Sequence, residues 1–300
     1  MRKRSSGKSA LLLIFAVLVF ILSTTVPALC EDEKTVKYGS ITVKVTDTSV
    51  DLKGEKVSSV DKLTSFLDQL PALKQADMYE SALTLDQMET LSSRYPNVFF
   101  GWTLTIAEHT VRTDATAFST LHNHKSPAHT SKDFEVLKYC KNLLALDLGH
   151  NAVTDISFLN YLPNLRILIL GRNKIGDTTP IGTLKDLEYL ELFSAGVKDI
   201  STLSNCAKLK DLNISNNRIQ DLAPVLKLPA LERLWLCGSQ NGILSAKSFT
   251  KTQKQEIEAQ VVPGCIVNYS GAGTQAGWRD HPRYNILSEI FSTGVYRPWK

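Results

Sequence analysis

The residues best suited to metal chemistry are three closely spaced histidines, His122, His124 and His129, with Asp114 before them and Asp133 after them. Imidazole nitrogens and carboxylate oxygens are common zinc ligands. These histidines, however, occur in the segment HNHKSPAHTS, whose proline and small polar residues are typical of a loop. Metal ligands usually need ordered surroundings that hold them in place. We therefore expect a polar loop without a bound metal, and a zinc titration by calorimetry tests that expectation.

Sequence patterns of enzymes are otherwise missing. No G-x-S-x-G, H-E-x-x-H or phosphate-binding glycine loop occurs. The glycine-rich stretch GAGTQAG near residue 271 follows no repeat strand and opens no clear helix, so we expect a turn there. His281 stands between two arginines and before Pro282, and we expect it to serve the C-terminal cap. The sequence therefore favours a binding protein over an enzyme, and we expect no cofactor.

A 22-residue repeat supplies the elements that would position binding residues. Five segments of the form L-x-x-L-x-L align without a gap, starting at Leu143, Leu165, Leu187, Leu209 and Leu231. Three of them continue to an asparagine: Asn151, Asn173 and Asn217. The pattern resembles the leucine-rich repeat. A single repeat cannot bury its apolar face, so neighbouring repeats stack to form one core.

Each repeat is expected to contain a short strand and a tight return. Side chains alternate faces along a strand, which directs a pair of apolar residues from each repeat into the core: Leu146 and Leu148, Leu168 and Leu170, Leu190 and Leu192, Leu212 and Ile214, Leu234 and Leu236. The asparagine side chains are expected to form hydrogen bonds with backbone groups where the chain turns after the strand, since an amide both donates and accepts. A second constant pattern begins with residues suited to cap short helical or 3₁₀ turns: Asp155, Asp177, Asp199 and Asp221.

These features predict an α/β solenoid, a leucine-rich repeat horseshoe with a parallel concave sheet and short 3₁₀ or helical convex turns. We divide it into a signal peptide (1–30), an N-terminal cap with irregular repeats (31–135), regular repeats (136–244) and a C-terminal cap (245–300). In the irregular part we expect a helix with Leu85, Met88 and Leu91 on one face, then a β-hairpin or protruding arm near residues 97–114. The aromatic and apolar tail after residue 276 is expected to cover the exposed end of the core.

The residues between the inward leucines face the concave surface, where the repeats of a solenoid bind their partners. Aromatic residues and arginine are enriched at protein interfaces. We therefore predict a ligand-binding surface made of Ile169, Tyr189, Glu191, Phe193, Asn213, Arg233 and Trp235. For Trp235, packing beneath the C-terminal cap is the alternative. If the surface is exposed, replacing Tyr189 and Phe193 by alanine weakens partner binding and leaves folding intact.

The form L-x-x-L-x-L-x-x-N-x-I-x-D-I-x-x-L resembles the short bacterial repeats of internalins over residues 136–244, and more weakly over 50–135. The segments RYPNVFFGWTL, RTDATAF and GWRDHPRY resemble secreted repeat proteins of Gram-positive firmicutes. Internalins are surface proteins that bind host receptors through the concave face, so the resemblance implies a protein-binding module. An envelope module that recognises glycan or peptidoglycan is the alternative. The caps differ from those of internalins and no sorting motif follows the repeats, so host-cell invasion is not implied.

The first residues indicate export. A basic start, MRKRSSGKSA, precedes the apolar run LLLIFAVLVFIL and the small-residue exit STTVPALCEDE, as in a secretory signal peptide. The run is short for a spanning helix, which needs about 20 residues. Cleavage after Ala28 or Cys30, retention as an anchor and lipidation at Cys30 all remain open. We expect a protein secreted by, or held on the surface of, a Gram-positive bacterium, with no transmembrane segment beyond the signal.

Charge argues against a nucleic-acid partner. The chain has 34 Lys and Arg residues against 30 Asp and Glu residues, and four of the basic residues lie in 1–28: Arg2, Lys3, Arg4 and Lys8. The chain after the signal is therefore balanced at 30 against 30, whereas a nucleic-acid-binding surface is net basic. We expect a protein partner and a monomeric chain.

Four cysteines follow the signal region: Cys140, Cys206, Cys237 and Cys265. Cys140 and Cys206 occupy equivalent positions three repeats apart, about 14 Å at the usual strand spacing, beyond the reach of a disulfide. We expect them to be small buried apolar groups. A Cys237–Cys265 disulfide that locks the C-terminal cap is a possible bridge, which a non-reducing mass map tests.

Overall fold

The computed structural model describes residues 34–120, 128–237, 249–271, 274 and 277–298. The chain divides into two compact units, Met1–Lys34 and Thr35–Lys300, and the second unit contains all the elements that follow. The predicted signal peptide, Cys30, His122 and His124 lie outside the described residues. Within the described part of the chain, no helix combines the length and apolar character needed to cross a membrane.

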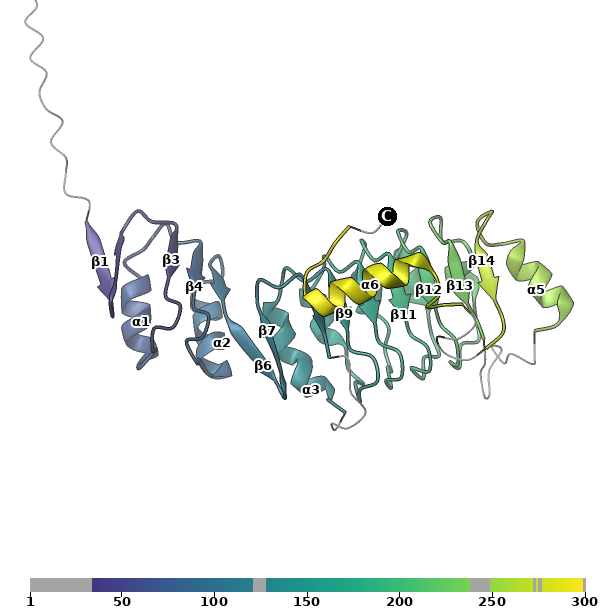
Figure 1. Ribbon diagram of the computed structural model, residues 1–300, viewed down its shortest axis with the longest axis horizontal. Coiled ribbons are helices and arrows are strands. Elements are labelled where there is room, and N and C mark those ends of the chain that lie inside the picture. Colours follow the sequence, from purple (N-terminus) through teal and green to yellow (C-terminus); the bar gives the residue numbers. More distant parts are fainter. Residues whose placement is uncertain (1–33, 121–127, 238–248, 272–273, 275–276, 299–300) are drawn as a thin grey trace, which may run out of the picture. The chain divides into compact units, whose positions relative to one another are not determined.

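Short parallel strands form the concave side of the unit (Figure 1). Seven of them make one sheet in the order β14-β13-β12-β11-β10-β9-β8. Their bounds are β8 Ala117–Ser119, β9 Ala145–Asp147, β10 Ile167–Ile169, β11 Tyr189–Glu191, β12 Asp211–Asn213, β13 Arg233–Trp235 and β14 Ile266–Asn268. From β9 to β13 the register is one full repeat, for example Ile169 opposite Glu191 and Asn213 opposite Trp235. The predicted solenoid with a parallel sheet is therefore confirmed.

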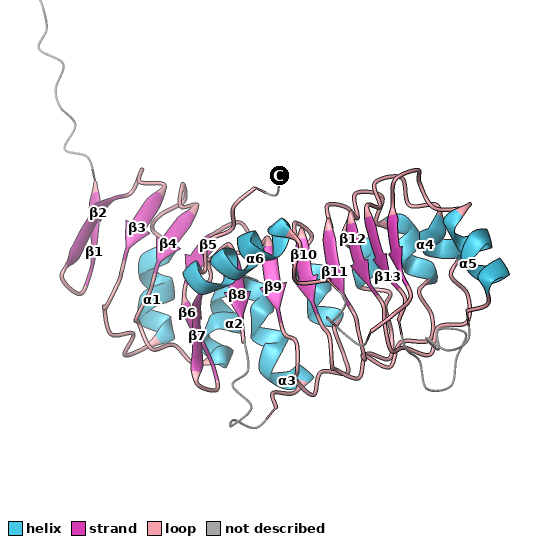
Figure 2. Cartoon of the chain, turned by 45° about the vertical axis from the view of Figure 1, so that its right-hand side comes forward, coloured by secondary structure: helices cyan, strands magenta, loops and turns pink. Residues whose placement is uncertain are grey.

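Helices and 3₁₀ turns return the chain on the convex side (Figure 2). They are α1 Val60–Leu67, α2 Leu85–Arg94, α3 Ser131–Phe134, η1 Glu135–Tyr139, η2 Ser157–Tyr161, η3 Ile181–Thr183, η4 Ser201–Asn205, α4 Ala223–Leu226 and α5 Lys251–Glu258. The predicted helix near residue 85 is present, and Met88 and Leu91 are buried. Leu85, at the first turn, is instead 54% exposed.

Repeat-specific hydrogen bonds fix the turns between strand and return. Asn173 Nδ2 donates to the carbonyls of Leu148 and Leu170 at 2.8 and 2.9 Å, while its Oδ1 accepts from Val153 N at 2.9 Å. Asn217 makes the same contacts two repeats later. The repeat aspartates accept from the backbone N–H two residues on, each at 2.8 Å. The inward apolar pairs are fully buried and the asparagines bind backbone groups at the turns, so these two predicted roles are confirmed. The aspartates lie before the N-cap residues Ile156, Pro180, Ile200 and Leu222, so the prediction that they are themselves the caps was wrong.

The N-terminal part is less regular, as predicted. The hairpin of β1 Thr35–Tyr38 and β2 Ile41–Lys44 precedes a three-stranded parallel sheet of β3 Ser49–Asp51, β4 Gln75–Asp77 and β5 Phe99–Gly101. A second hairpin, β6 Thr103–Ile106 and β7 His109–Arg112, stands between the two parallel sheets. Thr113 anchors it, because its Oγ1 accepts from Trp102 N and donates to Phe100 O at 2.8 and 2.9 Å.

The C-terminal part of the chain forms two segments that pack in different places. Residues 249–271 close the end of the core: Phe249, Ile257 and Val261 belong to the core cluster, and β14 pairs with β13. The last helix, α6 Pro282–Thr293, instead lies across the strands on the concave side (Figures 1 and 2). Its end reaches β8, where Gly294 O accepts from Ala117 N at 3.2 Å. The prediction that this tail covers the end of the solenoid was therefore wrong.

The four described cysteines are free thiols. Cys140 and Cys206 are buried in the core, as predicted. The Cys237–Cys265 disulfide that was considered possible is not formed. Strand pairing explains why: Cys265 precedes β14 and aligns with Glu232, five residues before Cys237, which corresponds to about 16 Å along a strand. Cys237 also packs on the concave side, whereas Cys265 packs against the main core.

Candidate ligand-binding cavity on the concave face

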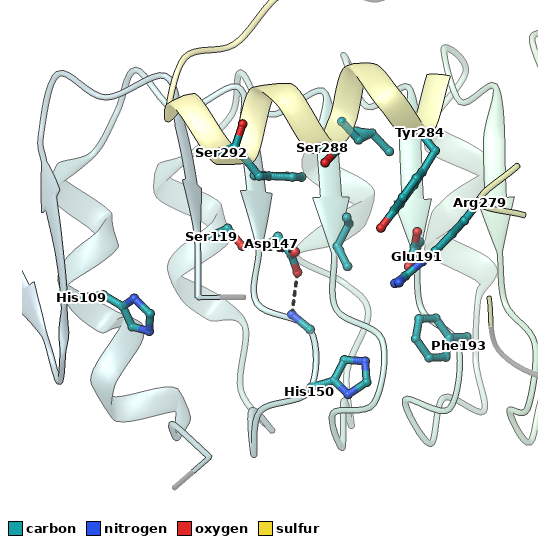
Figure 3. A pocket seen from close by; sticks show the side chains of 14 residues that line it. His109, Ser119, Asp147, His150, Glu191, Phe193, Arg279, Tyr284, Ser288 and Ser292 are labelled. Atoms are coloured by element: carbon teal, nitrogen blue, oxygen red, sulfur yellow. Dashed lines mark hydrogen bonds between the residues drawn. The ribbon is translucent and has the colours of Figure 1, made fainter. Parts of the chain in front are cut away.

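A cavity of about 530 Å³ lies between the concave strands and α6 (Figure 3). The sheet side contributes Ser119, Asp147, Gly149, His150, Ile169, Glu191 and Phe193. The C-terminal segment contributes Arg279, Tyr284, Leu287, Ser288, Phe291 and Ser292, and His109 adds a side chain from β7. Ligand pockets usually measure about 300–1,000 Å³ and combine apolar walls with a few placed polar groups. The size and lining of this cavity fit that description.

Asp147 is a buried carboxylate on the cavity floor. Its Oδ1 accepts from Gly149 N at 2.9 Å, and its Oδ2 accepts from Ser119 Oγ at 3.3 Å. Burial raises the pKa of Asp147 to about 6, and the charge of Glu191 acts in the same direction. The group therefore carries its negative charge near neutral pH but is easily neutralised by mild acid.

Glu191 is the second buried carboxylate, with no exposed surface. Its Oε1 accepts hydrogen bonds from Trp278 Nε1 at 2.7 Å and from the Tyr189 hydroxyl. Its Oε2 is buried and has no hydrogen-bond partner among the described residues. Burial raises the pKa of Glu191, while the donors from Tyr189 and Trp278 lower it. A buried acceptor left unpaired costs about 1–3 kcal/mol, and a donor on a ligand would remove that cost.

Apolar side chains surround the carboxylates. Phe193 lies over Gly171, where an added Cβ would overlap the phenyl ring. His150 meets the same ring edge-on at 6.2 Å between centroids. The absence of a side chain at Gly171 thus makes the space that the Phe193 ring occupies, and Gly149 lines the cavity itself. Leu287 and Phe291 of α6 add further apolar lining.

Guanidinium groups act on both cavity carboxyls. The charge of Arg279 lowers the pKa of Asp147 and of Glu191, and the charge of Arg233 also lowers the pKa of Glu191. The Arg279 side chain also lies over the Tyr284 ring at 5.1 Å. The carboxylate of Asp147 and the unpaired Oε2 of Glu191 on one side of the cavity favour a cationic or donor-rich ligand group.

The other half of the predicted surface is covered by the chain itself. Trp278 is fully buried, with its ring 5.4 Å from Tyr189 and 5.1 Å from Trp235 between centroids. The Arg233 guanidinium lies 4.4 Å from the Trp278 ring and donates to the Trp278 carbonyl at 3.2 and 3.3 Å. The aromatic and arginine side chains that suggested a partner therefore bind an internal tryptophan.

An ion-pair network secures this cover. Asp211 has no exposed surface and accepts from Arg233 Nε at 2.7 Å and from Arg283 of α6 at 3.0 Å. Arg283 also pairs with Glu232. His281 begins α6 as its N-cap residue, accepting from Arg283 N at 3.3 Å through Nδ1. Paired burial of this kind is costly to break from one side.

The predicted binding residues thus fall into two groups. Ile169, Glu191 and Phe193 line the cavity. Tyr189, Asn213, Arg233 and Trp235 are buried on the covered half, so the prediction that they form an exposed surface was wrong. The alternative interpretation of Trp235, packing beneath C-terminal residues, is the observed one. Because Tyr189 and Phe193 are both buried, replacing them by alanine would disturb folding, contrary to the expectation from the sequence.

Sequence reasoning missed the cavity residues that come from elsewhere in the chain. Asp147 was not among the predicted binding residues, although an acidic residue beside the inward Leu146 and Leu148 was an available signal. Tyr284, Leu287 and Phe291 recur at helical spacing, which was an available signal for a helix with an apolar face. Nothing in their spacing showed which surface that face would cover.

Of the histidine segment and its flanking aspartates, His129, Asp114 and Asp133 lie in the described part of the chain. His129 is buried and lies against His109 of β7, with the ring centroids 5.6 Å apart. Asp133 caps α3 through Thr130, and Asp114 pairs with Arg112 at 2.8 Å. The aspartates are therefore engaged in local structure.

Comparison with known proteins agrees with the repeat architecture. The family model described as "Leucine Rich repeats (2 copies)" matches residues 141–182 and 207–250. No curated protein matches the chain at a significant level. Among solved structures, internalin C2 of Listeria monocytogenes is 21% identical, with 76% of this chain and 84% of that chain covered and a TM-score of 0.39.

Two further solved structures are similar at the same level. Another internalin of Listeria monocytogenes is 20% identical, with 67% of this chain and 78% of that chain covered and a TM-score of 0.32. A leucine-rich repeat protein of Leptospira interrogans is 22% identical, with 67% and 50% covered and a TM-score of 0.38. No functional residue is carried over from these structures.

The stacked strands, the asparagine and aspartate contacts and the matched repeats define a leucine-rich repeat protein. Leucine-rich repeat solenoids generally act as protein-binding modules through an extended concave surface. In this chain the C-terminal segment occupies that surface and leaves the cavity as its open part.

Proposed function

We propose that this chain is a protein-binding module whose cavity between β8–β11 and α6 receives a basic side chain from a partner segment. The observation that carries the proposal is the buried Oε2 of Glu191, which has no hydrogen-bond partner among the described residues and belongs to a cavity-lining side chain. A lysine or arginine of the partner would donate to this oxygen, and charge-assisted hydrogen bonds of that kind are the strong ones.

The remaining lining supports the same ligand class. Ile169, Phe193 and Leu287 offer apolar contacts to the stem of a long basic side chain, which buries its methylene groups while its charge is paired. Asp147 adds a second negative charge on the floor. Binding is therefore expected to weaken as pH falls through about 6, the pKa of Asp147, because protonation removes the negative charge of that carboxylate.

The test compares two charge-neutralising variants in a pull-down from a bacterial surface proteome. Glu191→Gln keeps an acceptor for Trp278 Nε1 but removes the charge inside the cavity. Asp155→Asn removes one charge from the convex side, where Asp155 accepts from Ser157 N at 2.8 Å. We expect a partner that is captured by wild type and by Asp155→Asn and is lost with Glu191→Gln.

Peptides that tile the captured partner then identify the inserted residue. Replacing one lysine or arginine by glutamine should abolish binding measured by calorimetry, while replacing acidic residues should not. Equal capture by Glu191→Gln would refute the assignment of the cavity. Specific binding on a glycan array, displaced by no peptide, would instead support recognition of an envelope glycan.

We also propose that the chain is exported and acts outside a Gram-positive cell. The basic start and apolar run within residues 1–30 support export. N-terminal sequencing of the protein from culture medium and cell-wall fractions tests it. We expect a mature chain that starts at Leu29 or Glu31, and full-length protein confined to the cytoplasm would contradict export.

A further inference from the structure

Two histidines and a glutamate meet at the tip of the β6–β7 hairpin. Nε2 of His109 lies 3.7 Å from one carboxylate oxygen of Glu108, and Nε2 of His129 lies 3.7 Å from the other. One potential ligand atom from each of the three residues lies within 4.8 Å of the other two. The two imidazole rings are nearly perpendicular, at 84°. Both nitrogens thus converge on the same carboxylate from different directions.

The solenoid itself holds His129 in place. Its backbone N–H donates to Asn151 Oδ1 at 3.0 Å, and its carbonyl accepts from Ala152 N at 2.8 Å. The ring packs edge-on against Phe134 at 5.9 Å between centroids. The repeat asparagine therefore fixes the backbone of His129, and the core fixes its ring, which are the ordered surroundings that a metal ligand requires.

The hairpin presents the other two residues. Ala107 has a left-handed backbone, φ 51°, which reverses the chain so that Glu108 and His109 follow directly in the turn and the next strand. The His109 ring packs edge-on against Phe118, and its Nε2 is buried with no hydrogen-bond partner in the described part of the chain. Glu108 is about half exposed, which leaves the site accessible from solvent.

We propose that Glu108, His109 and His129 bind a divalent transition metal ion, with Zn²⁺ as the probe. Two imidazole nitrogens and one carboxylate are a ligand set that such ions take. A cation between the three groups would replace the 3.7 Å approaches by direct coordination, and three protein ligands leave a position for water or a further ligand. His109 also lines the cavity, so the bound ion would stand at its margin.

The site differs from the H-x-H-x₄-H pattern in the sequence, which joins His129 to His122 and His124. The structure supplies two partners from the hairpin about twenty residues earlier in the chain. The inference rests on this convergence and is independent of the cavity proposal, since its readout is metal binding alone.

The test is calorimetric titration of the tag-free chain with Zn²⁺ after treatment with EDTA. We expect one equivalent to bind, and Co²⁺ in its place to give visible absorption typical of a site with nitrogen ligands. Glu108→Gln and His109→Gln should each weaken Zn²⁺ binding at least about tenfold, since even changes in outer-shell partners reduce affinity by that much. The melting temperature in EDTA checks that both variants fold.

The double variant His122→Ala with His124→Ala is the matched control, because it removes two imidazoles from the neighbouring segment and none from the proposed ligand set. Unchanged binding by this variant, together with weakened binding by the hairpin variants, supports the site. Loss of binding in the double variant with retention in Glu108→Gln and His109→Gln would assign the metal to the histidine segment and overturn the proposal. A flat titration of the wild type would overturn it as well.

Discussion

The two halves of the concave sheet are built from the same repeat but differ in what lies above them. Over β11–β13, Trp278 fills the space between Tyr189 and Trp235, and Arg233 pairs with Asp211 beneath it. Over β8–β10, α6 leaves a cavity bordered by Asp147 and Ile169. Residue type therefore does not separate ligand-binding positions from core positions on this face, because the same types serve both purposes.

The cause of the difference is where the C-terminal segment places its large side chains. Leu287 and Ile290 of α6 pack in one cluster with Ala117, Ala145 and Ile167 near the β8–β10 end. Two small residues follow the strands β9 and β10 on this side. Gly149 lines the cavity, and Gly171 lies under the Phe193 ring, which also lines it. The second core therefore extends over both halves, from Ala117 to Trp235, and the open half also keeps buried carboxyl groups facing a cavity.

Removing the tryptophan should give the largest effect. Trp278→Ala deletes the ring that Tyr189 and Trp235 enclose and leaves Glu191 Oε1 without the indole donor. We expect a loss of about 3–5 kcal/mol in the free energy of unfolding, as for other buried large-to-small changes, measured by urea denaturation. Trp278→Phe keeps most of the ring and should lose less. A loss under about 1 kcal/mol, the range of many ordinary substitutions, would show that the covered half is not a core.

The ion pair beneath the tryptophan comes next. Arg233→Met leaves the buried carboxylate of Asp211 with Arg283 as its remaining ion-pair partner, and breaking one side of a buried pair typically costs about 3–5 kcal/mol. Lys208→Met is the control, because Lys208 pairs with Asp186 at 2.5 Å on an exposed surface, where such pairs contribute about 0–1 kcal/mol. Equal losses in the two variants would contradict the difference in burial.

The buried Asp147 of the open half should make the free energy of unfolding depend on pH. The pKa of Asp147 is raised to about 6 in the folded chain from 3.8, so the folded state binds more protons than the unfolded state between these values. Its contribution to the free energy of unfolding therefore falls as pH rises from about 4 to 6, by up to about 3 kcal/mol. Asp147→Asn should remove that fall in urea denaturation series, and parallel curves for the two proteins would contradict it.

The smallest expected effect concerns the cavity wall. Gly171→Ala places a Cβ against the Phe193 ring and should destabilise the chain by about 1–3 kcal/mol through overpacking. Gly176→Ala is the matched control in the same repeat, since an added Cβ there meets nothing within 4 Å. Thermal melting compares them. If Gly171→Ala has the same melting temperature as the wild type, the Phe193 ring can move aside and this wall of the cavity is not rigid.

Much of the fold was predictable because the structural roles of the repeat residues depend on contacts within one repeat or between neighbouring repeats. The inward leucines and the turn asparagines act within one repeat or between neighbours, so their roles follow from local spacing. The hairpin near residue 103 and the helix near residue 85 were predicted for the same reason. The candidate site was predicted only in part, through Ile169, Glu191 and Phe193.

The remainder depends on contacts between residues far apart in the sequence. Trp278 meets Glu191 across 87 positions, and Tyr296 N donates to Thr116 Oγ1 across 180. His129 meets Glu108 and His109 only because the hairpin and the first regular repeats lie side by side. The possible Cys237–Cys265 bridge is absent for a related reason: strand register places Cys265 opposite Glu232, away from Cys237.

The sequence by itself determined a stack of leucine-rich repeats, because a 22-residue period with alternating apolar residues permits burial of the leucines only through stacking. Only the tertiary structure decided which part of the concave face is core and which part is open. That choice depends on where a single tryptophan and a twelve-residue helix come to rest on the sheet. Their apolar faces require burial, but nothing in their spacing specifies the surface that provides it.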